Sequence, residues 1–309
     1  MKIVALLQSY NEQRFIGDCL DHLAAHDISA YLVDNESTDD TVAIAERRLE
    51  KNLIGIETLA RDGHFALHAQ LRRKEELAQS LDADWLMHLD TDEFRASPDY
   101  GRSLARAIED ADEAGFNAVN FLEFVFVPTL EAPNHDHADY LRTMRSYYPV
   151  LPQFPNRLNA WKRQDGPINL TKSGGHWVSF PGLRMAPRSM YSRHYLFLSL
   201  PDVARKFGSK RYAPEEVARG WHHWRVDQTP ASIELPSERD LRTYTADHLL
   251  DPSKPYKSTG RVLGQAEERL LVQRRWLRHH SPQWFKRALR RSRLRPSSPT
   301  ASTEGEMPR

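Results

Sequence analysis

The chain has 309 residues, of which 40% are hydrophobic, and its 43 basic side chains nearly balance 42 acidic ones. This length and apolar content allow a full hydrophobic core, which excludes a short peptide or a fibrous protein. No apolar run approaches the roughly 20 residues of a membrane-spanning helix, and the N-terminal segment turns polar too early for a secretory signal.

Strand and helix patterns alternate through the first hundred residues. Short apolar runs at 3–7, 31–33, 53–58 and 85–90 predict four strands, and the segments between them carry apolar side chains at helical spacing. Repeated units of this kind predict an α/β fold with a parallel sheet and helices on its faces. In such sheets ligands bind at the carboxyl ends of the strands.

Polar side chains follow three of the predicted strands at the point where each strand ends. They are Tyr10, Asn11 and Glu12 after the first strand, Asp34 after the second, and Asp90 and Asp92 after the fourth. Because side chains alternate along a strand, Asp90 and Asp92 leave it on the same side and offer two oxygen ligands to Mg²⁺ or Mn²⁺. An acidic turn without a metal is the alternative interpretation. Neither the dinucleotide motif G-x-G-x-x-G nor a P-loop occurs, so neither fold is supported.

The order and spacing of these segments resemble family 2 glycosyltransferases with the GT-A fold, over residues 1–130. The resemblance implies a mostly parallel, twisted sheet with helices on both faces, and a nucleoside-diphosphate sugar of the UDP or GDP type as donor. It also assigns roles to the polar residues. Nucleotide contacts are implied for Tyr10, Asn11, Glu12, Asp34 and Asp90, and metal contacts with Mn²⁺ or Mg²⁺ for Asp90 and Asp92.

The second half of the chain is less regular. Residues 118–127 predict another strand, and 128–155 predict a long loop, which in the family shapes the acceptor site. His194 lies in an apolar segment that resembles the strand whose histidine completes the metal shell, although a satisfied strand histidine is the alternative. Lys206, Lys210 and Arg211 would then face the diphosphate. We interpret His135 and His137 as part of a polar surface loop rather than as a metal cluster.

The catalytic base cannot be assigned by resemblance. Inverting members of the family usually carry a Glu-Asp pair, and none follows the predicted acceptor loop before His194. His176, beside two glycines, is the first candidate because an imidazole near neutrality can take a proton from a hydroxyl. Asp165 is the second candidate, with Glu93 and Asp136 behind it. We expect inversion at the anomeric carbon.

The C-terminal part is strongly basic. From Arg269 to Arg295 arginine and lysine interleave with apolar residues, and no acidic residue occurs. This pattern predicts basic amphipathic helices, which either contact anionic lipid on the cytoplasmic face of a membrane or pack their apolar side on the main domain. The single cysteine, Cys19, fits a reducing compartment, so we expect a cytoplasmic protein.

We expect one catalytic domain in two halves, with a C-terminal helical extension. Residues 1–130 would bind the nucleotide sugar, 131–212 would supply the acceptor side and complete the metal site, 213–295 would form the basic extension, and 296–309 would be disordered. No nucleic acid partner is expected.

The predicted function is a metal-dependent, inverting hexosyltransferase that acts on a glycan or a lipid-linked acceptor. Two other classes stay open. A phosphohydrolase of the haloacid-dehalogenase type also uses a D-x-D motif. That motif requires threonine or valine two residues after the second aspartate, where this chain has Phe94. A catalytically silent scaffold would instead use the basic C-terminus to hold a membrane or a polyanion.

Overall fold

The computed structural model describes residues 1–150, 157–208, 210–219, 221–222 and 229–253, which all belong to one compact unit, Met1–Val262. The predicted basic helices between Arg269 and Arg295 and the predicted disordered tail lie outside the described residues. Within the described part, no helix is both long and apolar enough to cross a membrane. The domain boundaries expected from the sequence stay predictions.

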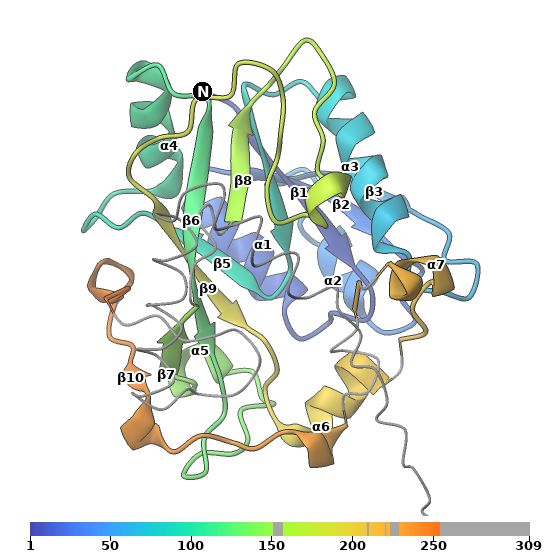
Figure 1. The fold of residues 1–309 in the computed structure, drawn as a ribbon, viewed down its shortest axis with the longest axis vertical. Helices are drawn as coiled ribbons and strands as arrows, with labels where there is room; N and C mark the ends of the chain where they lie inside the picture. The colour runs from blue at the N-terminus through green and yellow to red at the C-terminus, as the bar shows by residue number, and fades with distance from the viewer. Residues whose placement is uncertain (151–156, 209, 220, 223–228, 254–309) are drawn as a thin grey trace, which may run out of the picture. The chain divides into compact units, whose positions relative to one another are not determined.

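The first half of the chain consists of alternating strands and helices (Figure 1). The strands are β1 (Ile3–Ser9), β2 (Ser29–Asp34), β3 (Leu53–Thr58) and β4 (Trp85–Asp90), and the helices between them are α1 (Ile16–Ala25), α2 (Thr41–Glu46) and α3 (Leu67–Ser80). The strands lie in the order β4-β1-β2-β3 and pair in parallel. Their carboxyl ends therefore meet at one edge of the sheet.

Helices cover both faces of this parallel part, as the alternating side chains of β1 require. Ile3, Ala5 and Leu7 point to one face, where they share a core with α1 and with α4 (Leu104–Glu113). Val4 and Leu6 point to the other face and share a core with α3. The α/β fold class and the helices on both faces, both predicted from the sequence, are confirmed.

The second half adds strands that pair out of chain order. They are β5 (Glu93–Ala96), β6 (Ala118–Phe126), β7 (Ser146–Pro149), β8 (Arg157–Lys162), β9 (Met190–Tyr195) and β10 (Arg242–Thr243). The short helices here are α5 (Tyr140–Thr143), α6 (Leu200–Val203) and α7 (Pro214–Ala218). Strand β8 lies antiparallel between β4 and β6, while β9 runs parallel to β6 and antiparallel to β5.

Two sequence-based expectations for this half need correction. The segment 128–155 is no continuous loop, because α5 forms within it and β7 pairs with the edge of β6. The strand β5 was also missed: it starts three residues after β4 ends, and four residues are too few to show a period. Pairing of β5 with β9 places His194 opposite Glu93, although about 100 residues separate them in the chain.

Candidate active site

The two aspartates of the D-x-D motif lie in the tight link between β4 and β5. Asp90 is the last residue of β4, and its Oδ1 accepts a hydrogen bond from Nε2 of Gln8 at 2.9 Å. Asp92 is buried and precedes β5. Its backbone carbonyl accepts from the amide of Tyr195 at 2.9 Å, so the motif is tied to the end of β9.

Two cations meet the carboxylate of Asp92. The ammonium group of Lys206 donates to Oδ2, and Nε2 of His194 lies 3.4 Å from the same oxygen. Both partners are buried, and they come from segments more than 100 residues later in the chain. The structure therefore places His194 beside Asp92, where the family resemblance expects it.

Burial and charge oppose each other at this group. Burial alone would raise the pKa of Asp92, but Lys206 and His194 hold it well below its usual range. Burial would lower the pKa of His194, whereas Asp92 and Glu123 raise it to about 10. At neutral pH His194 is therefore an imidazolium that faces Asp92 through Nε2 and donates to Glu123 through Nδ1.

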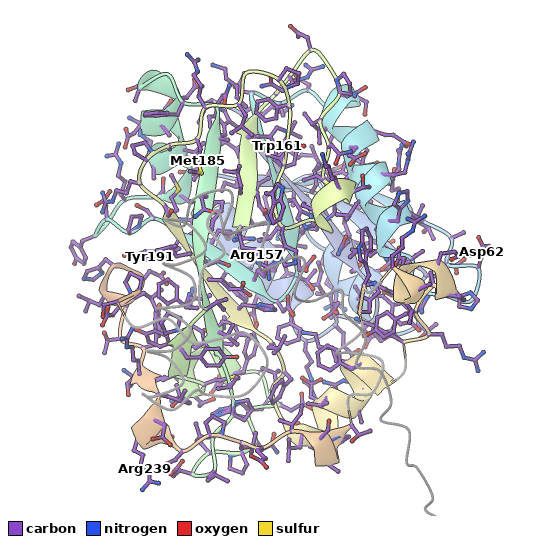
Figure 2. The ribbon with its side chains drawn as sticks, viewed as in Figure 1. Asp62, Arg157, Trp161, Met185, Tyr191 and Arg239 are labelled. Carbon is purple, nitrogen blue, oxygen red and sulfur yellow. The ribbon has the colours of Figure 1, made fainter. Side chains whose placement is uncertain are left out.

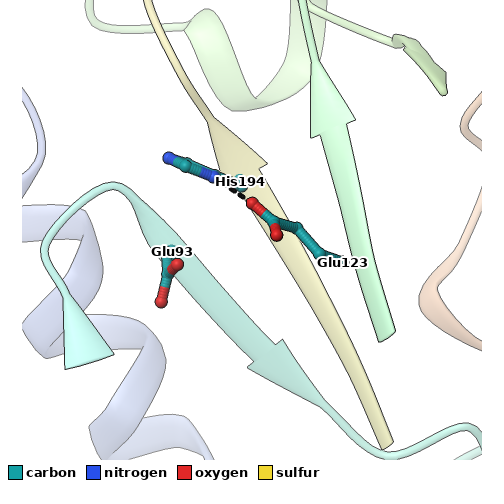
Figure 3. A group of neighbouring side chains, drawn as sticks. All are labelled: Glu93, Glu123 and His194. Atoms are coloured by element: carbon teal, nitrogen blue, oxygen red, sulfur yellow. Dashed lines mark hydrogen bonds and ion pairs between the residues drawn. The ribbon is translucent and has the colours of Figure 1, made fainter. Parts of the chain in front are cut away.

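Glu123 connects His194 to an arginine on the next strand. Its Oε1 accepts from Nδ1 of His194 at 2.6 Å, and both its oxygens accept from the guanidinium of Arg157 at 3.0 Å. On the neighbouring β5, Glu93 accepts from Arg95 at 2.6 Å and lies 3.8 Å from Arg157. Figure 3 shows Glu93, Glu123 and His194 on their three strands, with Glu123 reaching toward the imidazole.

Two donor sets near His194 are candidates for a metal. Among the described residues, Glu93, Glu123 and His194 bring ligand atoms within 4.8 Å of one another. The arginines on these two carboxylates disfavour a second cation there. The carboxylates of Asp90 and Asp92 also suit Mn²⁺ or Mg²⁺, but Lys206 donates to Asp92, so a metal there would have to displace this ammonium group. A cation on Nε2 of His194 would displace the proton there.

A cavity of about 380 Å³ opens at the carboxyl ends of β4 and β1. Most of the residues singled out from the sequence line it. They are Tyr10, Glu12, Asp90, Asp92, His176, His194, Lys206 and Lys210. Arg157 and Gln70, which the sequence did not single out, line it as well. Nucleotide-side and acceptor-side residues thus share one cavity.

Glu12 and Lys210 form a second charged pair in the cavity wall. Nζ of Lys210 lies 3.7 Å from Oε1 of Glu12. Burial raises the pKa of Glu12 to about 7, although Lys206 and Lys210 lower it. Lys206 and Lys210 are thus paired with Asp92 and Glu12 in the wall of the cavity. Their positive charges could also attract an anionic ligand.

Three predicted ligand contacts lie outside the cavity lining. Asp34 accepts hydrogen bonds from Oγ of Ser9 and from both the amide and the hydroxyl of Ser37, at 2.6–2.8 Å, so its carboxylate ties two loops together. Asn11 has a positive φ of 56°, and its Oδ1 accepts from the amide of Thr38 at 2.7 Å. Arg211 is exposed. The hydrogen bonds of Asp34 and Asn11 connect neighbouring loops, and the nucleotide contacts expected of these two residues stay predictions.

The surroundings of the two leading candidates for the base differ, and their role as base stays a prediction. Nη1 of Arg157 (Figure 2) lies 3.1 Å from Nδ1 of His176. A guanidinium only donates, so Nδ1 must accept and the neutral ring carries its proton on Nε2. His176 therefore presents an N–H rather than a basic nitrogen. Asp165 follows β8 where that strand pairs with Trp85, at the opposite end of β4 from Asp90, and does not line the cavity.

The remaining carboxylate candidates are occupied by arginines. Asp136 pairs with Arg14 at 2.9 Å and with Arg205 at 3.4 Å, and Glu93 is buried against Arg95. A Glu-Asp pair does occur at 109–110, but it lies in α4, where both residues pair with surface arginines. None of these groups lines the cavity.

Three residues of the site were not predicted from the sequence, and the sequence signal that could have indicated them differs from one to the next. Glu123 is a lone acid inside the apolar run of β6, and this contrast could have marked it. Arg157 starts β8, where no pattern distinguishes it from a surface arginine. Gln70 lies on the buried side of α3, and no sequence pattern distinguishes it from other glutamines in helices.

The sequence model of Glycosyl transferase family 2 matches residues 5–154, from β1 through β7. The matched residues make up just under half of the chain, and over this part the chain is similar to glycosyltransferase family 2. The match includes the D-x-D segment and the loops after β1 and β2, so the resemblance drawn from those segments is confirmed. A comparison with curated proteins gave no match.

Solved structures resemble this chain loosely. TarS from S. aureus (residues 1–349) matches with a TM-score of 0.39 and 13% identity, over 63% of this chain and 60% of TarS. Glucosyl-3-phosphoglycerate synthase from Mycobacterium tuberculosis, in complex with Mn²⁺, UDP and phosphoglyceric acid, matches with a TM-score of 0.29 and 17% identity, over 40% and 43%. The galactosyltransferase LgtC matches with a TM-score of 0.28 and 13% identity, over 52% and 58%. The chain thus spans less than two thirds of each of these proteins.

Proposed function

We propose that the protein is a divalent-metal-dependent hexosyltransferase. It would move a sugar, with inversion, from a nucleoside diphosphate of the UDP or GDP type to a hydroxyl of a glycan or a lipid-linked acceptor. One observation carries this proposal: Asp92, His194 and Lys206 converge from three distant segments in a cavity that Tyr10 also lines. The family match over residues 5–154 supports the reaction class.

The charges of the cavity suit the departure of a diphosphate. Lys206 and Lys210 stand in its wall, and phosphate oxygens accept strong charge-assisted hydrogen bonds from ammonium groups. Asp90, Asp92 and His194 would hold Mn²⁺ or Mg²⁺, which as a Lewis acid offsets the negative charge on the leaving group. The N–H that Arg157 fixes on His176 would orient an oxygen of the substrate on the acceptor side.

Thermal unfolding with nucleotides and metal tests the proposal. UDP or GDP at a hundred times its dissociation constant should stabilise the protein by about 2.7 kcal/mol. The shift should require Mn²⁺ or Mg²⁺ and should vanish in Asp92→Ala. A shift with polyanions alone would favour the silent scaffold, and release of phosphate from sugar phosphates would favour the phosphohydrolase.

A screen of nucleotide sugars then identifies the product. Transfer to a hydroxyl acceptor, with the anomeric configuration followed by NMR, should show the configuration inverted. Retention of configuration would contradict this part of the proposal, since direct attack by an acceptor from the opposite face inverts the centre.

We further propose a cytoplasmic location with contact to an anionic membrane through the segment from Arg269 to Arg295. The excess of basic residues in that segment supports the contact, because anionic headgroups attract lysine and arginine. Co-sedimentation with phosphatidylserine vesicles should occur and should weaken with salt. Equal binding to neutral vesicles would contradict it.

A further inference from the structure

Gln70 offers a hydrogen-bond acceptor to the cavity. It lies in the first turns of α3, has an exposed fraction of 1% and lines the cavity. Its Nε2 donates to Oδ1 of Asn35 at 3.0 Å, and Nδ2 of Asn35 donates to the backbone carbonyl of Leu59 at 2.8 Å. Two side-chain amides thus form a short chain that ends on a backbone oxygen.

This chain fixes which end of the Gln70 amide faces the ligand. A backbone carbonyl can only accept, so Asn35 must turn its NH₂ group to Leu59 and its oxygen to Gln70. Gln70 must then give its NH₂ group to Asn35. No donor among the described residues contacts Oε1 of Gln70. Since Gln70 lines the cavity, this oxygen is available to accept a hydrogen bond from a bound molecule.

The position of Gln70 assigns it to the base of the donor nucleotide. The strands lie in the order β4-β1-β2, with the charged groups of Asp92 at β4 and the loop of Tyr10 after β1. Asn35, the partner of Gln70, follows β2 directly, and Leu59 follows β3. The Gln70 chain therefore lies on the β2–β3 side of the sheet, away from Asp92 after β4.

Asp34 is the residue that the family resemblance assigns to the nucleoside here. Its two oxygens already accept three hydrogen bonds from Ser9 and Ser37, and it does not line the cavity. Gln70 does line the cavity on this side, and its oxygen is an acceptor.

We propose that Gln70 selects the nucleobase by accepting a hydrogen bond from a ring N–H. Uracil (N3–H) and guanine (N1–H) carry such a proton on their Watson–Crick edge, whereas cytosine and adenine present a bare ring nitrogen at the same place. The acceptor oxygen of Gln70 would face that nitrogen without a proton between them. The proposal rests on the proposed function, since it names the base of the same donor.

Calorimetric titration with nucleoside diphosphates tests this selection on the full chain in the presence of Mn²⁺. Wild-type protein should bind UDP about tenfold or more tightly than CDP, and GDP more tightly than ADP, because a mismatched base brings no N–H to the acceptor oxygen of Gln70. Gln70→Met keeps the length of the side chain without its amide, and its preference for UDP over CDP should fall to about twofold or less. Gln79→Met, at an exposed position of the same helix, should keep the wild-type preference.

The outcomes separate the two proposals. If CDP binds the wild type as tightly as UDP, or if Gln70→Met keeps the wild-type ratio, Gln70 does not read the base, while the transferase function stands. If no nucleoside diphosphate binds, the proposed function and the role of Gln70 both fall. The wild-type ratios decide the matter even if Gln70→Met does not fold.

Discussion

The cavity has two sides that are built differently. The donor edge consists of the carboxyl ends of β4, β1 and β2, with Asp90, Asp92 and the loop of Tyr10. The acceptor wall consists of β6, β8 and β9, with Glu123, Arg157 and the adjoining His176. The donor edge comes from consecutive strand–helix units, whereas the acceptor wall joins strands that are distant in the chain.

The two sides also treat their charges differently. In the acceptor wall Glu123 is paired with Arg157, and on the adjoining β5 Glu93 is paired with Arg95. At the donor edge Lys206 and Lys210 face Asp92 and Glu12, in a place where a diphosphate can exchange partners with the carboxylates. We expect the acceptor wall to act as a fixed support, and the ion pairs of the donor edge to rearrange if a diphosphate binds there.

Asp92→Ala should have the largest effect, because it removes the carboxylate on which the cations of the donor edge converge. We expect a loss of sugar transfer on the order of 10³-fold, which corresponds to several kcal/mol of metal-assisted charge stabilisation. Asp165→Ala is the matched control, and it should retain wild-type rates because Asp165 lies at the opposite end of β4. Undiminished transfer by Asp92→Ala would remove the donor edge from the mechanism.

Glu123→Leu tests whether the acceptor wall is a support. It leaves Arg157 and His194 buried without their carboxylate, so the free energy of unfolding in urea should fall by about 3–5 kcal/mol. Glu76→Leu, which breaks an exposed pair with Arg73, should cost less than about 1 kcal/mol. Equal losses in the two variants would mean that the buried network adds nothing to stability.

Lys74, beneath the donor edge, should give stability a distinct pH dependence. Burial lowers its pKa from 10.5 to about 7, against the raising effect of Asp90 and Glu93, and its Nζ lies 2.9 Å from Nδ1 of His88. In the unfolded chain Lys74 keeps its proton up to its ordinary pKa of 10.5, whereas in the folded protein it loses the proton near pH 7. Between these two pH values folding releases a proton, so the free energy of unfolding rises with pH.

Lys74→Met removes this titration. Relative to the variant, the wild type should gain stability by a few kcal/mol as the pH rises from about 7 to about 10, in urea unfolding at a series of pH values. If the difference in unfolding free energy between the two proteins stays constant over this range, the pKa of Lys74 is the same in the folded and the unfolded chain.

Gly175 marks the contact between the two sides and should give the smallest effect. Its φ is 84°, and an added Cβ would lie 2.8 Å from Nε2 of His88, whereas Gly174, with a φ of 65°, has open space at that position. Gly174→Ala should cost about 1–2 kcal/mol from backbone strain alone. Gly175→Ala should cost about 1 kcal/mol or more beyond that in thermal unfolding, because the ring of His88 must move. Equal costs would mean that this contact is loose.

The donor edge could be predicted from the sequence to a large extent. Periodicity gave β1 to β4 and their helices, and the parallel order of such units brings Tyr10, Asp90 and Asp92 to one edge. The resemblance added His194 and the two lysines of the cavity. The hydrogen bonds that take Asp34 and Asn11 out of the cavity could not be predicted, because they join side chains of two different loops.

The acceptor wall could not be predicted in the same way. The partners of Glu123 are 34 and 71 positions away in the chain, and no local pattern records which strand will lie beside which. The proton position on His176 depends on Arg157 and exists only once β8 and the glycine segment are in place. The role of Gln70 likewise depends on two amides meeting from different strands.

The sequence by itself determined the strand–helix repeat, the edge at which ligands bind and the acidic pair that ends β4, because these follow from local periodicity and from the direction of parallel strands. Only the tertiary structure decided which charges neutralise one another, which nitrogen of His176 carries a proton and which oxygen faces the nucleobase side. These properties depend on contacts a few ångströms long between residues far apart in the chain, and folding alone brings such residues together.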